Sequence, residues 1–240
     1  MSDVSDENNR AYYDDFSAGY ETERGFGYHR MLDDLEMQVV APFAQGKRVL
    51  EIGCGTGLIL TRLARVATHA VGIDVSPGML RAARERGLRV ALASATRLPF
   101  PDESFDLVCS FKVLAHVPDV ERALIEITRV TRPNGRMILE FYNPWSLRYL
   151  AKRIAGPQAI SEGRTEADVF TRWHSPLAIR TLLPANVAIE GFRGVRVLTP
   201  AAFVHKLPVL SDVLVRAERR AVDSPLRYFG GFLIVIARKR

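Results

Sequence analysis

The chain has 240 residues, of which 48% are apolar and 25% are charged, a composition typical of one ordinary globular domain. Its apolar stretches, such as residues 232–237, are far shorter than the roughly 18–20 residues that cross a bilayer, so we expect no membrane-spanning segment. Residues 1–10 are polar and acidic, unlike a secretion signal, which favours a cytoplasmic protein.

The net charge of +6 is unevenly distributed along the chain. The first 45 residues are acidic, and the rest becomes increasingly basic toward the C-terminus. Because Lys and Arg are scattered singly, without interleaved aromatic residues, we expect no nucleic-acid partner. The only cysteines, Cys54 and Cys109, fall in the predicted interior and are expected to be free, buried thiols.

The first half of the chain alternates between helix-like and strand-like patterns. The predicted order is a helix with its apolar face over residues 31–40, a strand over 48–52, a helix over 58–67 and a strand over 70–74. Ser76 followed by Pro77 is typical of a helix start, and Gly87 is expected to end that helix. These elements form one β-α-β unit.

The alternation continues to residue 142 and then changes. We expect strands over 88–93 and 105–110, a loop over 98–104, a helix over 120–130, a turn at 133–135 and a strand over 136–142. Residues 189–198 and 228–237 read as two further strands separated by a helical insertion. The pattern predicts a mostly parallel sheet with helices on both faces and a late antiparallel strand.

The segment 49–57 is a strand that runs into a glycine-rich turn and then a helix. Gly53, Gly55 and Gly57 would let the backbone approach a ligand at the carboxyl end of the first strand. Leu58 occupies the third glycine position of a dinucleotide fingerprint, and no Lys-Ser/Thr pair completes a P-loop. The turn therefore suits a ligand that lacks a pyrophosphate.

Two carboxylates stand at neighbouring strand ends. Glu51 lies at the end of a buried strand, where its charge needs a partner such as a cationic ligand group. Asp74 ends the second strand, at a position where an acid can accept hydrogen bonds from both ribose hydroxyls. Together they suit a nucleoside that carries an amino group.

Five ordered motifs resemble class I S-adenosylmethionine-dependent methyltransferases, and more narrowly the ubiquinone/menaquinone biosynthesis branch. The motifs occupy residues 49–57, 72–80, 98–107, 113–119 and 129–135. The resemblance implies a Rossmann-like seven-stranded sheet of order 3-2-1-4-5-7-6 with strand 7 antiparallel. It also implies an N-terminal arm over 1–45, a cofactor-binding core over 46–142, and acceptor-lid insertions with the last two strands over 143–240, all in one domain.

The same resemblance assigns S-adenosylmethionine as the cofactor and implies its contacts. Glu51 would face the methionine amino group, Asp74 would hold the ribose, and the other implied contacts are Tyr13, Tyr20, Gly53, Cys54, Gly55, Val75, Met79, Ser94, Ala95 and Phe111. The family usually has an Asp beside the adenine amino group, where this chain has Ser94. Ser94 can still accept a hydrogen bond, but this contact loses its charge. Tyr13 and Tyr20 are equally compatible with a surface helix packed on the sheet.

Methyl transfer from a sulfonium needs alignment and exclusion of water, but no metal and no covalent intermediate. A general base is needed only where the acceptor must lose a proton. His116, just beyond the fourth strand, and His174, in the region where relatives build acceptor pockets, are the candidates, each weighed against a packing role.

The segments 145–154 and 202–221 mix apolar and basic residues and lie outside the shared motifs. They are interpreted as a lid packed on the sheet or as a contact with an anionic membrane or a lipid-like acceptor. The leading hypothesis is methyl transfer to an oxygen, nitrogen or carbon atom of a small, largely apolar acceptor. The alternative is a non-catalytic cofactor-binding or partner-scaffold protein, and the sequence leaves monomer and homodimer open.

Overall fold

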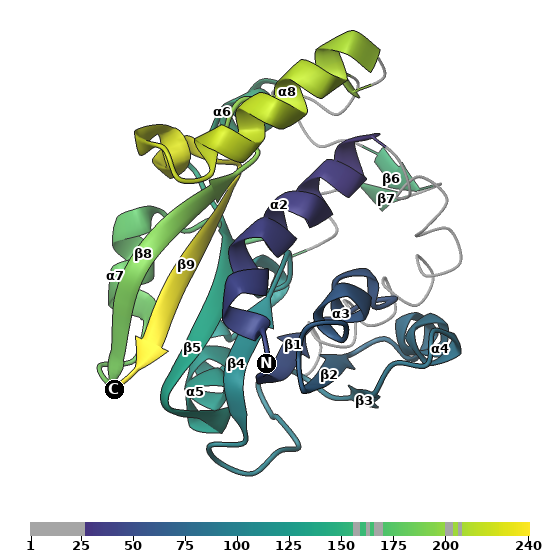
Figure 1. Cartoon of the computed structure of the whole chain (residues 1–240). Helices are drawn as coiled ribbons and strands as arrows, with labels where there is room; N and C mark the ends of the chain where they lie inside the picture. Colours follow the sequence, from purple (N-terminus) through teal and green to yellow (C-terminus); the bar gives the residue numbers. More distant parts are fainter. Residues whose placement is uncertain (1–26, 156–158, 162–163, 166–169, 200–203, 206–207) are drawn as a thin grey trace.

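The computed structural model describes residues 27–155, 159–161, 164–165, 170–199, 204–205 and 208–240. Its centre is a seven-stranded sheet of order β3-β2-β1-β4-β5-β9-β8 (Figure 1). The strands are β1 (Arg48–Ile52), β2 (His69–Asp74), β3 (Val90–Leu92), β4 (Phe105–Ser110), β5 (Thr131–Tyr142), β8 (Val187–Val195) and β9 (Phe232–Lys239). Since β9 is antiparallel to both β5 and β8, the predicted order and strand direction are confirmed.

Helices cover both faces of this sheet, as the sequence predicted. They are α2 (Gly27–Ala44), α3 (Leu58–Leu63), α4 (Pro77–Glu85), α5 (Val120–Val130), α6 (Leu147–Ala155), α7 (Pro176–Leu182) and α8 (Pro208–Ala221), with short 3₁₀ helices η1 (Leu114–His116) and η4 (Pro225–Phe229). A separate hairpin of β6 (Ala159–Ser161) and β7 (Arg164–Thr165), which the sequence analysis did not predict, lies in the insertion after α6. No helix in the described part of the chain is long and apolar enough to cross a membrane.

Several predicted boundaries differ from the structure. The strand expected over 228–237 is β9 (Phe232–Lys239), because residues 225–229 form the 3₁₀ helix η4. The strand expected over 189–198 ends at Val195, and the one expected over 88–93 covers only Val90–Leu92. The helix expected to reach residue 67 ends at Leu63. Beyond it, the backbone N–H groups of Arg65 and Val66 donate to carbonyls three residues earlier, which is a 3₁₀ pattern, and the Val66 carbonyl accepts the N–H of Gly46. The predicted turn at 133–135 lies inside β5, where the pairing jumps from Phe105 with Thr131 to Leu107 with Arg136. Asn134 has a φ of 61°, so the backbone leaves the extended conformation there, but ladder pairing is present on both sides of this irregularity.

Apolar side chains of alternate strand positions fill a core on each face of the sheet. Ile138 of β5 packs with α2 in one core, whereas Leu139 packs with α5 in the other. This two-sided burial explains why the central strands read as continuous apolar runs rather than alternating ones. The loops that follow β1, β2, β3 and β4 then meet at one end of the sheet, where doubly wound sheets bind their ligands.

The buried carboxylate of Glu218 in α8 forms hydrogen bonds with the segment that follows β8. Glu218 is fully buried, and its two oxygens accept the backbone N–H groups of Val197, Leu198 and Thr199 at 2.8, 2.9 and 2.7 Å. The segment after β8 leaves the sheet and loses its ladder partners, so this side chain supplies the acceptors that the backbone needs.

Glu218→Ala is therefore expected to lower the free energy of unfolding by roughly 3 kcal/mol, because three N–H groups lose their acceptor in the interior. Urea denaturation at an unchanged slope measures the effect. Glu85→Ala, which removes an exposed carboxylate at the end of α4, is the control and should change stability by no more than about 0.5 kcal/mol. Equal stability of the two variants would contradict this account of α8.

Candidate functional site

The turn after β1 depends on glycine at its first position. Gly53 has a φ of 69°, and a Cβ placed there would lie 2.2 Å from a methyl group of Val113. Gly57 has a φ of 85° and would likewise collide with Leu88. The backbone of this turn is thus held against the loop after β4, in a left-handed conformation that side chains disfavour.

Asp74, at the end of β2, connects this turn to the start of α4. Its two carboxylate oxygens accept the backbone N–H of Gly55 at 2.8 Å and that of Ser76 at 2.9 Å. Each carboxylate oxygen can accept more than one hydrogen bond, so these contacts orient the group without exhausting its capacity. Asp74 can therefore receive ligand hydroxyls while it holds the glycine turn.

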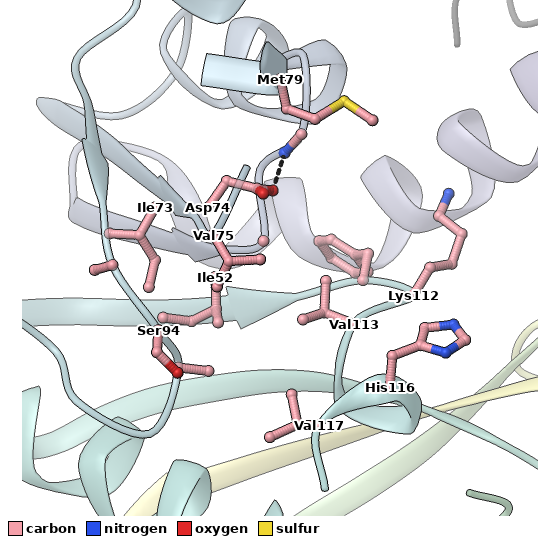
Figure 2. A pocket seen from close by; sticks show the side chains of 15 residues that line it. Ile52, Ile73, Asp74, Val75, Met79, Ser94, Lys112, Val113, His116 and Val117 are labelled. Atoms are coloured by element: carbon pink, nitrogen blue, oxygen red, sulfur yellow. Dashed lines mark hydrogen bonds between the residues drawn. The ribbon is translucent and has the colours of Figure 1, made fainter. Parts of the chain in front are cut away.

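An open cavity lies between these loops, at the carboxyl ends of β1, β2, β3 and β4 (Figure 2). Its empty space, including the part open to solvent, is about 850 Å³, which suits a nucleoside-sized ligand. The lining residues are Ile52, Gly53, Gly55, Ile73, Asp74, Val75, Met79, Ala93, Ser94, Ala95, Phe111, Lys112, Val113, His116 and Val117. Most of this wall is apolar, so the few polar groups in it decide ligand orientation.

A smaller, acidic cavity adjoins the first and shares Gly53, Phe111 and Lys112 with it. Glu51 is 3% exposed, and its Oε2 atom has no hydrogen-bond partner among the described residues. Burial, and secondarily the negative charge of Glu36, raises the pKa of Glu51 well above its usual range. A buried carboxyl with an unused oxygen at a cavity wall can accept a cationic ligand group.

Lys112 is the cation that already lies beside this acidic cavity. Its Nζ atom lies 2.7 Å from Glu36 Oε1 and 3.2 Å from Asp33 Oδ1, both on α2. Its backbone N–H donates to Glu140 Oε1 at 3.1 Å, and burial raises the pKa of Glu140 well above its usual range. Lys112 therefore joins α2 to β5 at the edge of both cavities.

His116 reaches the main cavity from η1, on the side of Lys112 (Figure 2). Its Nδ1 atom lies 2.9 Å from the Phe170 carbonyl oxygen, and its Nε2 atom lies 3.2 Å from the Tyr142 hydroxyl. A carbonyl only accepts, so this contact places the proton of a neutral imidazole on Nδ1 and leaves Nε2 as the acceptor. Burial lowers the pKa of His116, which favours that neutral ring.

The structure separates the two candidate histidines. His174 is not in the cavity lining; its ring packs edge-on against Phe141 at 5.5 Å, and its backbone N–H donates to Tyr142. Its surroundings match the packing role that the sequence analysis weighed against catalysis.

The implied cofactor contacts fall into three groups. Gly53, Gly55, Asp74, Val75, Met79, Ser94, Ala95 and Phe111 line the main cavity, whereas Glu51 and Cys54 line the acidic one. Tyr13 and Tyr20 lie outside the described residues. Cys54 and Cys109 are free and buried, and burial raises the pKa of both thiols, so neither is a nucleophile at neutral pH.

Sequence reasoning missed Lys112, Asp33 and Glu36. Lys112 could have been found by position, because it follows β4 at the sheet end that the other candidates share. Asp33 and Glu36 gave no comparable signal, since acidic residues in an amphipathic helix are normally solvent-exposed.

Comparison with known proteins shows which class of protein this chain resembles. Residues 50–139 match the model of a methyltransferase domain family. The matched segment runs from β1 into β5 and contains the glycine turn, Asp74 and His116. The chain resembles class I S-adenosylmethionine-dependent methyltransferases, the class that the sequence motifs suggested, and the cofactor implied by that class is S-adenosylmethionine.

Curated relatives narrow the resemblance to one branch. A demethylmenaquinone methyltransferase of Mycobacterium sp. (strain KMS) is 44% identical over 100 residues, which are 41% of this chain and 44% of that protein. One from Clavibacter sepedonicus is 35% identical over 143 residues, 56% of this chain and 58% of that protein. The matched regions thus span about half the length of these relatives.

Solved structures extend the likeness to the whole fold. A methyltransferase from Thermotoga maritima covers 95% of this chain and 98% of its own, with a TM-score of 0.68 and 23% identity. A didemethyltoxoflavin N-methyltransferase from Burkholderia thailandensis covers 100% of this chain and 90% of its own, with a TM-score of 0.64 and 15% identity. At these identities the likeness concerns the fold alone.

The raised pKa of Glu51 predicts a pH-dependent stability in the ligand-free protein. The folded state binds this proton more tightly than the unfolded state does, so stability is lost as pH rises from the unfolded pKa toward the folded one. Glu51→Gln removes this loss, and its stability relative to the parent protein should increase as pH rises. Urea denaturation across a pH series measures the difference, and a difference independent of pH would contradict the assignment.

Proposed function

We propose that the protein binds S-adenosylmethionine in the two adjoining cavities and transfers its methyl group to a small, largely apolar acceptor. The observation that carries the proposal is the placement of Asp74 in one cavity and Glu51 in the other, with the Gly53 turn between them. Two carboxylates spaced in this way suit a ligand with ribose hydroxyls and an ammonium group.

The described residues fit this cofactor. Asp74 would accept the ribose hydroxyls, and the unused Oε2 of Glu51 would accept the methionine ammonium group. Val75, Met79 and Ala95 give an apolar surface for the adenine. The Ser94 Oγ atom lies 2.8 Å from Thr96 Oγ1 and forms a hydrogen bond with it. The side chain at this position thus makes a local hydrogen bond where the family usually has a charged contact to the adenine.

The bound cofactor would supply an electrophilic methyl group on a sulfonium. The chain's own task is then to align the acceptor with that group and to exclude water, both of which an apolar wall favours. Phe111, Val113 and Val117 form such a wall beside His116. An oxygen, nitrogen or carbon atom of an apolar acceptor that approaches along this wall would be the nucleophile.

His116 is proposed as the general base where the acceptor must lose a proton. Its Nδ1–H is held by the Phe170 carbonyl, so Nε2 is the atom that can take a proton. The Tyr142 hydroxyl, 3.2 Å away, donates to this atom in the ligand-free protein, so the acceptor would have to displace that hydrogen bond before Nε2 could take its proton. His174 is not included, because it does not line the cavity.

The nature of the acceptor is proposed from two observations. The cavity wall is predominantly apolar, and the curated relatives are named for demethylmenaquinone, a quinone. Quinone-like phenols are therefore the first acceptor class to screen. If the cofactor binds and none of a broad acceptor panel is methylated, the non-catalytic alternative becomes the better account.

Asp74→Ala is expected to weaken binding of S-adenosylmethionine and S-adenosylhomocysteine by roughly 30-fold, because charge-assisted hydrogen bonds to the ribose are lost. Isothermal titration calorimetry measures both affinities. Asp74→Asn keeps one acceptor for the glycine turn and should give an intermediate loss. Asp102→Ala, which removes an exposed carboxylate paired with Arg129, is the matched control and should bind normally. Unchanged affinity in Asp74→Ala would refute the ribose contact.

His116→Gln is expected to lower kcat by about 100-fold for an acceptor that must lose a proton, with little change in KM for S-adenosylmethionine. In the parent protein the rate should rise with pH and level off below the ordinary histidine pKa, because burial lowers the pKa of His116. The variant should lack this rise. The same pH profile in both proteins would exclude His116 as the base.

A further inference from the structure

Apolar side chains on α6 face solvent. Leu147, Leu150 and Ile154 are 54%, 55% and 79% exposed, and their spacing of three and four residues puts them on one side of the helix. Trp145, just before the helix, is 47% exposed. A helix that leaves its apolar side uncovered in this way is typical of a contact surface.

Two neighbouring segments add to this surface. Leu210 and Val213 of α8 and Leu226 and Phe229 of η4 are also exposed large apolar residues. We define the α6–α8 surface by the exposed apolar side chains Trp145, Leu147, Leu150, Ile154, Leu210, Val213, Leu226 and Phe229.

Strand register brings these segments to one end of the molecule. Tyr142, Phe232 and Val195 pair across β5, β9 and β8, so α6, η4 and the segment leading to α8 all leave the sheet at the same end (Figure 1). Gly231, which follows η4, lies against Arg148 of α6, so closely that a Cβ added to this glycine would be 3.2 Å from the Arg148 side chain. The 3₁₀ helix η4 in turn contacts α8. The α6–α8 surface is thus assembled from adjacent segments.

Basic side chains accompany this apolar surface. Helix α6 carries Arg148, Lys152 and Arg153 and no acidic residue. In α8, Arg216, Arg219 and Arg220 are exposed. Of the two acids of this helix, Asp212 is exposed, whereas Glu218 is buried and bound to backbone N–H groups. The charge that reaches solvent beside the apolar side chains is therefore mainly positive.

This combination favours an anionic partner with an apolar interior. A second copy of the chain could cover the apolar side chains, but it would bring like charges together. An anionic bilayer satisfies both features, because leucine and aromatic side chains enter the acyl boundary while Lys and Arg meet the head groups. The nine residues of α6 are too few to cross a bilayer, so a docked α6 would lie in the interface plane.

We propose that the α6–α8 surface docks the protein on an anionic lipid bilayer. This end of the molecule is also the end at which the cofactor cavity opens: Tyr142 contacts His116 through its hydroxyl, and the Arg148 guanidinium lies 4.4 Å from the centre of the Tyr142 ring. An acceptor dissolved in the bilayer would therefore enter the cavity from the docked side. Delivery of the acceptor rests on the proposed function, whereas docking itself does not.

Co-sedimentation of the full chain with lipid vesicles tests the docking. Vesicles of phosphatidylcholine with about a quarter phosphatidylglycerol should bind the protein at least tenfold more tightly than phosphatidylcholine alone. Salt at about 0.5 M should weaken that binding severalfold. Equal partition onto both vesicle types, or none onto either, would overturn the proposal. Calorimetry with S-adenosylhomocysteine on the same sample tests the proposed function separately.

Matched variants locate the contact. Leu150→Ser combined with Ile154→Ser should weaken vesicle binding about tenfold or more, because two apolar side chains no longer enter the bilayer. Leu177→Ser removes a leucine that is 64% exposed on α7, outside the α6–α8 surface, and should bind vesicles normally. Both variants should retain the parent midpoint of urea denaturation, which reports an intact fold whether or not the cofactor binds.

Charge and self-association complete the test. Arg153→Glu combined with Arg220→Glu should abolish the preference for anionic vesicles, since both side chains are exposed beside the apolar surface. Sedimentation velocity of the parent protein and of the Leu150→Ser, Ile154→Ser variant should show the same oligomeric state. A dimer that dissociates in that variant, with no vesicle binding by the parent, would assign the surface to a second copy and overturn the proposal.

Discussion

The ion pairs of Lys112 hold the site together. One ammonium group lies within 3.2 Å of a carboxylate oxygen from both Glu36 and Asp33, and the backbone of the same residue donates to Glu140. Lys112 also has a φ of 61°, a left-handed conformation that a lysine adopts only where its surroundings enforce it. Breaking one partner of a buried pair costs about 3–5 kcal/mol, so α2, β4 and β5 are fixed relative to one another at the cavity edge.

The same arrangement leaves the acidic side of the site short of positive charge. Asp33, Glu36, Glu51 and Glu140 surround one lysine, and burial raises the pKa of Glu51 and Glu140. A cationic ligand beside Glu51 would favour the ionised form of this carboxyl. Because the carboxyl is already buried in the folded protein, ligand binding would not have to supply the free energy of burying it. The site is thus complementary to an ammonium group, whereas the adjoining cavity is predominantly apolar.

Local features of the site could be predicted from the sequence because spacing alone determines them. Gly53 and Gly55 directly follow a buried strand, and Asp74 ends the next one, so the parallel sheet brings them together whatever else the chain does. The order of the seven strands followed from the resemblance to a family and was confirmed.

Features that depend on tertiary packing could not be predicted. Nothing in the sequence distinguishes Asp33 and Glu36 from the solvent-exposed acids that most helices carry, because their burial depends on Lys112 from a distant segment. His116 and His174 were both candidates from the sequence, and the structure places His116 in the cavity and His174 against Phe141. The turn expected at 133–135 lies inside β5, because strand pairing continues on both sides of a register shift there.

The segment that matches the methyltransferase domain and the segments of the α6–α8 surface are different parts of the chain. The segment that matches the methyltransferase domain ends at residue 139, before α6, η4 and α8. These later segments are fixed to the sheet by their own polar contacts, in which Asn143 donates to the carbonyls of Tyr228 and Gly230 and Glu218 binds the end of β8. Because their outer sides need no apolar contact to stay in place, they are free to present leucine and arginine to a partner while the cofactor cavity behind them remains unchanged.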